Sequence, residues 1–284
     1  MPIDYETLRS FPVPEVRQRI RARDIILYAL SIGLAQDPLD HRQLDFVDHH
    51  RALKVVPSIA VVLGYPGFWL ADPKTGVDAV QLVHGEQGIV IHHPLPTSGE
   101  IIGRTRITGL IDKGAGAAAL LYTEKDVIDA ASGMLLATTS STTFLRGQGG
   151  FGGPAGPLKA VHKVPPGPPE ISLDLPTRPE QALYYRLNGD DNPLHADPAV
   201  ATRAGFPRPI LHGLCTLGVV CHALLAALAG YDATRFSALD LRFSSPVFPG
   251  ETIRTEIWRS GAFQARVVER DVLAVSNGRV VIAP

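Results

Sequence analysis

Residues 211–228 read LHGLCTLGVVCHALLAAL, a stretch that is apolar on nearly every side when it is drawn as a helix. A helix that is apolar all round is normally enclosed by other elements of the fold. The residues that follow favour strands, which we predict near 237–243, 252–259, 262–269 and 273–281. Polar and apolar residues alternate clearly in 252–258, as in a half-buried antiparallel strand. We therefore expect an antiparallel sheet wrapped around this helix.

The first half of the chain repeats this plan. A helix is predicted over 24–34, with Asp24 near its N-terminus. Strands are predicted near 81–92, 101–110, 117–126 and 135–145. The segment 94–101 also resembles 246–253, since both contain a Gly-Glu pair after a Pro-rich turn. The predicted fold class is therefore α+β, with two antiparallel sheets that each wrap a central helix.

The two repeats are separated by a segment with the composition of a linker. We predict the first repeat at 1–146, a Gly- and Pro-rich linker at 147–170 and the second repeat at 171–284. A dinucleotide-binding fingerprint would need a helix directly after the glycine run. Proline-rich sequence follows instead. The linker therefore carries no predicted ligand.

Composition and charge exclude several classes of protein. The 27 basic and 28 acidic side chains nearly cancel and form no dense basic stripe, so we predict no nucleic-acid partner. No apolar run reaches the roughly 18 residues of a membrane span, and the first residues lack a signal-peptide pattern. Cys215 and Cys221 lie within the apolar helix, where core thiols in a reducing compartment are expected. We therefore predict a cytoplasmic protein with no membrane partner.

The residues best suited to chemistry lie at 185–195, which read YRLNGDDNPLH. The path between Asp190 and His195 is bent, so we expect their side chains to converge. A neutral imidazole accepts a proton near pH 7, a carboxyl group donates one, and the Asn192 amide offers a neutral hydrogen bond. At the start of the long helix, the Gly213 N–H lacks an intrahelical partner. This set suits the addition or removal of water beside a carbonyl. Asx-Gly pairs alone also form ordinary turns.

The string at 185–198 resembles the signature of the type 2, R-specific enoyl-CoA hydratases, the MaoC-like dehydratase family. Blocks at 84–87, 204–216 and 241–250 are similar to that family too, most of all to the hydratase domain of peroxisomal multifunctional enzyme type 2. The resemblance implies a double hot-dog fold, a homodimer and a hydro-lyase without a cofactor. Its expected reaction is the reversible hydration of trans-2-enoyl-CoA to (3R)-3-hydroxyacyl-CoA in fatty acyl metabolism. Only the second half contains the catalytic string, so the first half is expected to shape the acyl pocket.

Individual site residues follow from positions that match the family. Asp190 and His195 match its catalytic acid–base pair, Asn192 its supporting amide, and Gly213 the backbone donor that faces the thioester oxygen. Asp191 is a departure, because relatives often carry a bulky residue there. The resemblance also nominates five residues for contacts with the substrate and its CoA: Tyr185, His84, Gly85, Lys113 and Arg242.

Other functions remain open from the sequence. The same fold would serve a 3-hydroxyacyl-ACP dehydratase, an acyl-CoA thioesterase or a non-catalytic acyl-CoA-binding subunit. A metal-dependent lyase would use Asp190, His195 and His212. The pairs at 49–50 and 92–93 add imidazoles, but adjacent residues on a strand point to opposite faces. Because no compact ligand spacing is present, no metal is predicted. Acyl chain length, reaction direction and the identity of the base are not fixed.

Overall fold

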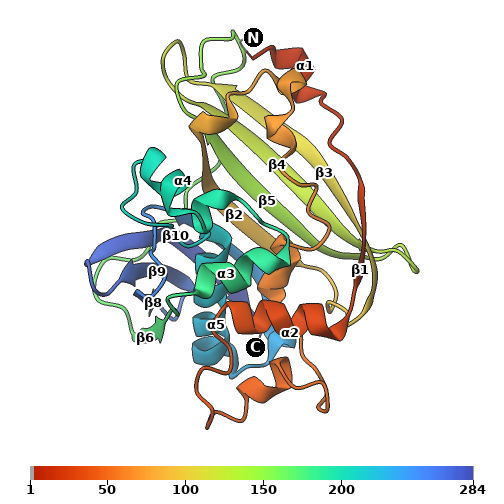
Figure 1. The fold of residues 1–284 in the computed structure, drawn as a ribbon, viewed down its shortest axis with the longest axis vertical. Helices are drawn as coiled ribbons and strands as arrows, with labels where there is room; N and C mark the ends of the chain where they lie inside the picture. Colours follow the sequence, from red (N-terminus) through yellow and green to blue (C-terminus); the bar gives the residue numbers. More distant parts are fainter. Residues whose placement is uncertain (1–2, 284) are drawn as a thin grey trace.

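The computed structural model describes residues 3–283, and its centre is one ten-stranded antiparallel sheet (Figure 1). The strands are ordered β1-β3-β4-β5-β2-β7-β10-β9-β8-β6 across the sheet. In chain order they are β1 (Val16–Ile20), β2 (Leu82–Ile91), β3 (Gly99–Asp112), β4 (Ala119–Asp129), β5 (Leu135–Leu145), β6 (Ile171–Pro176), β7 (Phe236–Phe243), β8 (Thr252–Ile257), β9 (Ala262–Val267) and β10 (Val272–Ile282).

Helices are short apart from two. The α-helices are α1 (Tyr5–Arg9), α2 (Ala22–Ser31), α3 (Gln181–Tyr185), α4 (Pro198–Arg203) and α5 (Gly213–Ala229). The 3-10 turns are η1 (Gln43–Phe46), η2 (Pro57–Val61), η3 (Trp69–Ala71), η4 (Pro73–Thr75), η5 (Ala79–Gln81), η6 (Arg186–Asn188), η7 (Pro193–His195) and η8 (Ala233–Arg235).

The sheet is built from two halves with the same topology. The first five strands are ordered 1-3-4-5-2 and the last five 6-8-9-10-7, which is the same order shifted by five. The first Gly-Glu pair singled out in the sequence, at 99–100, begins β3, and the second, at 250–251, directly precedes β8, so each marks the start of the third strand of its half. The duplicated plan is therefore present, and β2 and β7 pair to join the two predicted sheets into one. The domain boundaries themselves stay a prediction, although 147–170 contains no helix or strand.

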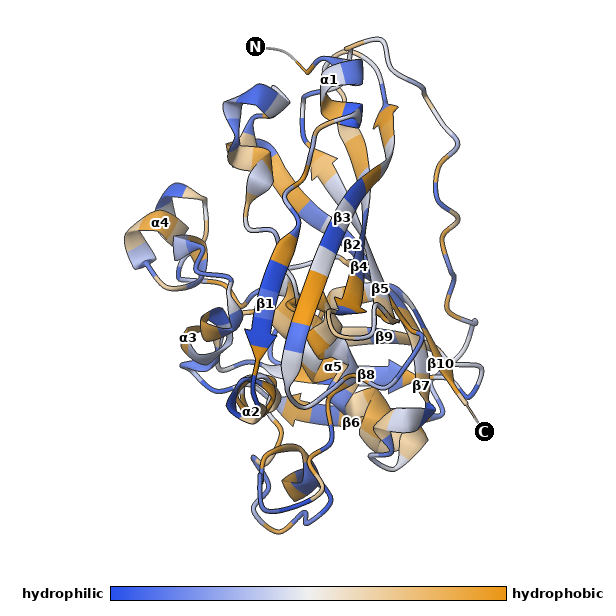
Figure 2. Ribbon diagram, turned by 90° about the vertical axis from the view of Figure 1, so that its right-hand side faces the viewer, coloured by the Kyte–Doolittle hydropathy of each residue, from blue (hydrophilic) through white to orange (hydrophobic). Residues whose placement is uncertain are grey.

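The helix α5 is the buried centre of the second half. Twelve of its residues are buried, and it contacts β6, β7, β8 and β10. Figure 2 shows it as a largely hydrophobic helix that lies against these strands. Gly230 ends it in the left-handed conformation, with φ of 58°, which glycine adopts without a steric penalty. The predicted wrapped helix is thus confirmed in this half.

The first half departs from that plan. Its helix α2 contacts α3, η1 and η6, whereas the element against β2 and β5 is the single turn η2. That turn also contacts α5. Hence the long helix α5 packs against the second half of the sheet, and in the first half the short turn η2 takes the place that we expected a second helix to fill.

The eight predicted strands are all present, but two strands were missed. β1 and β6 are the two edges of the sheet and contain only 5 and 6 residues. Charged residues alternate along β1, which is largely hydrophilic in Figure 2. Short, charged edge strands discourage pairing with other chains, and they give a weak sequence signal for the same reason. No helix among residues 3–283 has the length and hydropathy to span a bilayer.

Candidate active site

The acid–imidazole cluster forms where η6, η7 and the start of α5 meet. One carboxylate oxygen of Asp190 and one ring nitrogen each of His195 and His212 lie within 4.8 Å of one another. Gly189 precedes Asp190 with φ of 110°, a conformation that L side chains rarely adopt. The bend that brings Asp190 back toward His195 therefore depends on glycine. The predicted convergence of Asp190 and His195 is present.

The tautomer of His195 follows from its hydrogen bond. Its Nδ1 lies 2.8 Å from the carbonyl oxygen of Ile210. A carbonyl only accepts, so Nδ1 carries the proton and Nε2 presents its lone pair. His195 is buried, and burial lowers its pKa, although the Ile210 carbonyl and the charge of Asp190 act in the opposite direction. The ring is thus kept as a neutral proton acceptor at pH 7.

His212 belongs to the same cluster, and our candidate catalytic set omitted it. Its ring stacks on His195 with centroids 3.7 Å apart, and its Nε2 donates to the backbone oxygen of Asp190 over 3.2 Å. Burial lowers the pKa of His212 to about 3, so the ring is neutral. Tyr185 was expected in the substrate pocket, but its ring is fully buried beside His212, with centroids 5.0 Å apart. Tyr185 thus supports His212 from the protein interior.

The side chain of Asn192, the supporting amide, is oriented by a hydrogen bond within its own loop. Asn192 caps η7, because its side-chain oxygen accepts from the backbone N–H of Leu194 over 3.0 Å. Its backbone N–H also donates to the Asp190 carboxylate over 3.3 Å. The side-chain nitrogen of Asn192 therefore remains available to donate a hydrogen bond to a water or a thioester oxygen.

The first half contributes His84 to the wall of this site. Gly213 begins α5, and a Cβ added there would lie 3.5 Å from the ring of Phe243. The same ring meets His84 edge-on, with centroids 5.1 Å apart. The Nε2 atom of His84 is buried without a hydrogen-bond partner among residues 3–283. A buried donor or acceptor without a partner is costly, so this nitrogen is suited to a ligand.

Two further candidates lie around His84. Gly85 sits at a β-bulge, and a Cβ there would lie 2.1 Å from the ring of Phe144. Its role in the structure is to let β2 approach that ring. Lys113 is exposed in the turn after β3, at the end of the sheet where β2 begins. Three strand spacings separate it from β2, or roughly 15 Å.

Arg242, like Lys113, is not brought to the cluster. It alternates with Phe243 on β7, so the two side chains point to opposite faces of the sheet. Its guanidinium binds Glu86 across the β2–β7 seam, with Nη2 2.6 Å and Nε 3.0 Å from one carboxylate oxygen. The expectation of a CoA phosphate contact rested on matched positions, which do not reveal that this side chain already has a partner.

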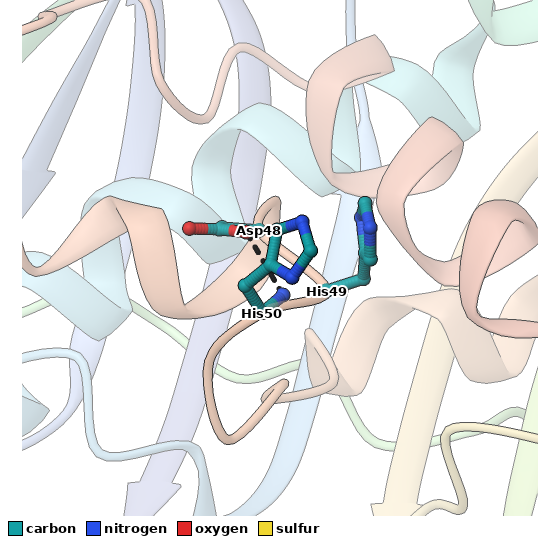
Figure 3. A group of neighbouring side chains, drawn as sticks. All are labelled: Asp48, His49 and His50. Carbon is teal, nitrogen blue, oxygen red and sulfur yellow. Dashed lines mark hydrogen bonds between the residues drawn. The ribbon is translucent and has the colours of Figure 1, made fainter.

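The histidine pairs lie elsewhere. Figure 3 shows Asp48, His49 and His50 in one turn, where the two rings lie 4.1 Å apart between centroids. Our argument that neighbours point to opposite faces assumed a strand and is wrong for this pair. His92 and His93 follow β2 and bind Thr138 and the backbone of Leu135 respectively. Neither pair joins the acid–imidazole cluster.

The ligand atoms of that cluster are closer together than the sequence spacing suggested. Asp190, His195 and His212 form a group of the kind that could hold a metal ion. The spacing argument failed because His212 is distant in sequence from Asp190 and His195 and is brought to them only by the fold. The absence of a metal from the reaction therefore stays a prediction.

The apolar segment 55–63 of the first half and the aromatic residues that follow it lie in different surroundings. The segment 55–63 is mostly buried in the main core. Phe68 and Trp69 instead line a cavity of about 730 Å³ together with Phe11, and none of the catalytic candidates lines it. About 41% of Tyr65 is exposed.

Comparison with known proteins agrees with this geometry. Residues 161–279 match the MaoC like domain and residues 19–147 match the MFE-2 hydratase 2 N-terminal domain. The chain belongs to the MaoC-like enoyl-CoA hydratase 2 family. It is 43% identical to 3-hydroxyacyl-thioester dehydratase Y of Mycobacterium tuberculosis, over 92% of this chain and 89% of that protein. It is 39% identical to the peroxisomal enoyl-CoA hydratase 2 of Arabidopsis thaliana, over 94% of this chain and 91% of that protein.

A solved structure shares the whole fold. The MaoC-like dehydratase of Phytophthora capsici superposes with a TM-score of 0.86 at 34% identity and covers 99% of both chains. Membership of the family and the predicted hot-dog fold class are therefore confirmed. The roles of the individual site residues rest on the geometry described above.

Proposed function

We propose that this protein hydrates trans-2-enoyl-CoA reversibly to (3R)-3-hydroxyacyl-CoA in fatty acyl metabolism. The observation that carries the proposal is the convergence of Asp190 with two neutral imidazoles in front of the N-terminus of α5. Hydration of an enoyl thioester needs one group that removes a proton from water and one that delivers a proton to C2. It also needs donors for the negative charge that develops on the thioester oxygen.

The proposed mechanism assigns each requirement to a residue. The Gly213 N–H binds the thioester oxygen at the positive end of the helix dipole. A water between Asp190 and the Nε2 atom of His195 attacks C3, with the Asn192 amide beside it. The step needs one proton on the pair at the start: the member without it accepts the proton of the water, the other delivers its proton to C2, and the pair again holds one proton at the end. The roles of acid and base are therefore assigned to the pair as a unit.

The other half of the chain is proposed to bind the CoA portion. The unpartnered Nε2 of His84 lies next to Phe243, and Phe243 covers Gly213. A thioester bound at Gly213 would therefore place its pantetheine arm near His84 and direct it along the sheet end toward Lys113. The charge of Lys113 suits a phosphate.

Product analysis with crotonyl-CoA tests the proposal. We expect 3-hydroxybutyryl-CoA of R configuration and no release of free CoA. Free CoA without a hydroxyacyl product would indicate a thioesterase instead. An S product, or binding without turnover, would also reject the proposal. A comparison of CoA with acyl-carrier-protein substrates separates the hydratase from a dehydratase of fatty acid synthesis.

Two further features are part of the proposal. We propose a homodimer, which the family resemblance implies. We also propose a cytoplasmic location, which agrees with two buried free thiols. The Arabidopsis relative is named as peroxisomal. Light scattering and cell fractionation test these two features separately.

A further inference from the structure

The first half of the chain reaches the catalytic loop through the last residue of α2. This helix lies beside α3 and η6 of the second half (Figure 1). Ser31 ends α2 and is fully buried. Its hydroxyl donates to the backbone oxygen of Tyr28 over 2.8 Å and accepts from the side-chain nitrogen of Asn188 over 3.0 Å. The hydroxyl therefore links its own helix to a residue of the second half.

The backbone oxygen of Ser31 contacts the second half as well. Because α2 ends at this residue, its carbonyl has no partner within the helix. It accepts from the side-chain nitrogen of Gln181 over 2.6 Å and lies 3.5 Å from the Sγ atom of Cys215. Gln181 begins α3, and Cys215 lies two residues after Gly213 in the first turn of α5. Ser31 thus contacts α3, η6 and the start of α5.

Both ends of the segment that leads to the catalytic acid are bound to Ser31. The elements α3 and η6 are consecutive and cover 181–188, with Gln181 first and Asn188 last. The side chain of Asn188 also donates to the backbone oxygen of Tyr185 over 2.9 Å, so one amide links the segment both to itself and to α2. The segment is therefore fixed against the first half at each of its ends.

Asp190 follows this segment almost directly. Gly189 alone separates it from Asn188, and Gly189 is the residue whose φ of 110° forms the bend. On the other side, the backbone oxygen of Asp190 is bound by the Nε2 atom of His212. A misplacement of about 1 Å in a catalytic group can lower a rate by about 10²-fold. The contact at Asn188, one residue before the bend, is therefore placed to control the position of the acid.

We propose that Ser31 is a positioning residue, through which the first half fixes Asn188 and thereby places the Asp190 carboxylate against the water that adds to C3. This inference rests on the proposed hydratase activity. Ser31 touches no reacting atom and acts through the Asn188 amide. The half that lacks the catalytic string therefore takes part in arranging the catalytic groups.

The kinetics of Ser31→Ala and Asn188→Ala test the proposal. Ser31→Ala removes the hydroxyl but keeps the backbone oxygen that binds Gln181, and the Asn188 amide keeps its bond to Tyr185. We expect each variant to lower kcat for crotonyl-CoA by about 10- to 100-fold. KM should change by less than about twofold, because the groups proposed to bind the thioester and CoA are untouched. Since both changes break the same contact, the double variant should be no slower than Asn188→Ala.

Thr75→Val is the matched control. Like Ser31, Thr75 is a buried residue of the first half whose hydroxyl donates to the backbone oxygen of the third residue before it and also accepts a hydrogen bond. Its partners in these two bonds, Asp72 and Val77, lie outside the catalytic loop. Thr75→Val should therefore retain wild-type kcat. An equal loss of kcat in this control would show that the effect is not specific to Ser31 and would overturn the inference.

The outcomes separate the inference from the proposed function. If wild-type protein does not hydrate crotonyl-CoA, the proposed function fails and the inference fails with it. If wild-type protein is active, the inference alone is overturned by a wild-type kcat in Ser31→Ala, by a raised KM without a fall in kcat, or by losses that multiply in the double variant. Should Ser31→Ala not fold, the half-buried Asn188 decides. A lower kcat with unchanged KM in Asn188→Ala supports the inference, and a wild-type kcat overturns it.

Discussion

Replacing Arg242 with methionine should lower the stability of the folded protein and leave its affinity for the CoA substrate unchanged. In the structure the guanidinium makes two charge-assisted hydrogen bonds to Glu86. The second oxygen of Glu86 accepts from the Thr142 hydroxyl over 2.7 Å. The Glu86 side chain is 15% exposed and that of Arg242 is 38% exposed. The burial of this ion pair is therefore intermediate between that of a fully buried pair and that of an exposed surface pair.

The size of the effect follows from that environment. Hydrogen bonds to charged groups contribute about 1.5–3 kcal/mol each, whereas exposed ion pairs contribute about 0–1 kcal/mol. Both donors share one oxygen, so we expect a total loss of about 2 kcal/mol in the free energy of unfolding. For a chain of 284 residues, that loss lowers Tm by roughly 3 °C, because the entropy of unfolding grows with chain length.

Calorimetry and steady-state kinetics check this prediction. Arg254 also makes two hydrogen bonds to one carboxylate, one to each oxygen of Asp174, but both side chains of that pair are exposed, so Arg254→Met is the control and should shift Tm less. KM for enoyl-CoA should stay within about twofold of wild type in Arg242→Met, because the side chain points away from His84 and Gly213. A tenfold or larger rise in KM with an unchanged Tm would refute the reasoning and make Arg242 a CoA ligand.

Three further outcomes are expected. First, burial lowers the pKa of His222 to about 4 and that of His212 to about 3, so the unfolded chain protonates near pH 6.5 while the folded protein does not. Stability should therefore fall as pH drops from about 6.5 toward 4, and His222→Gln should flatten the slope by up to about 1.4 kcal/mol per pH unit in urea unfolding. Second, Gly103→Ala should lower Tm, because its Cβ would collide with the backbone of Gly64, at a cost of about 1–3 kcal/mol; a wild-type Tm would show that the two main chains are not in contact. Third, exhaustive chelation should leave turnover unchanged, and loss of turnover that zinc restores would make Asp190, His195 and His212 metal ligands.

Local pattern was enough to predict most of the fold. Most turns between the eight interior strands contain Gly or Pro, β8 alternates strictly between buried and half-buried residues, and α5 is apolar all round. β1 and β6 escaped notice because they are edge strands of only 5 and 6 residues. The place of η2 against β2 and β5 also had no local signal, since it depends on packing against α5.

The candidate site was predictable only where its residues are close in sequence. Asp190 and His195 are linked by one bend, and their convergence follows from that bend. The stacking of His212 on His195 requires the path of the loop before α5, and the orientation of Arg242 requires the pairing of β7 with β2. Long-range register of this kind is not encoded in any single stretch.

The central claim is that Asp190 and His195 act on one water molecule. The most direct test is kcat for crotonyl-CoA hydration by Asp190→Asn, by His195→Gln and by the variant with both substitutions. Groups that work as a unit are not additive, so each single change should lower kcat by about 10²–10⁴ and the second change should add little. All three proteins should keep the wild-type Tm within a few degrees. Near-normal kcat in either single variant, or a combined loss equal to the product of the two, would contradict a shared water.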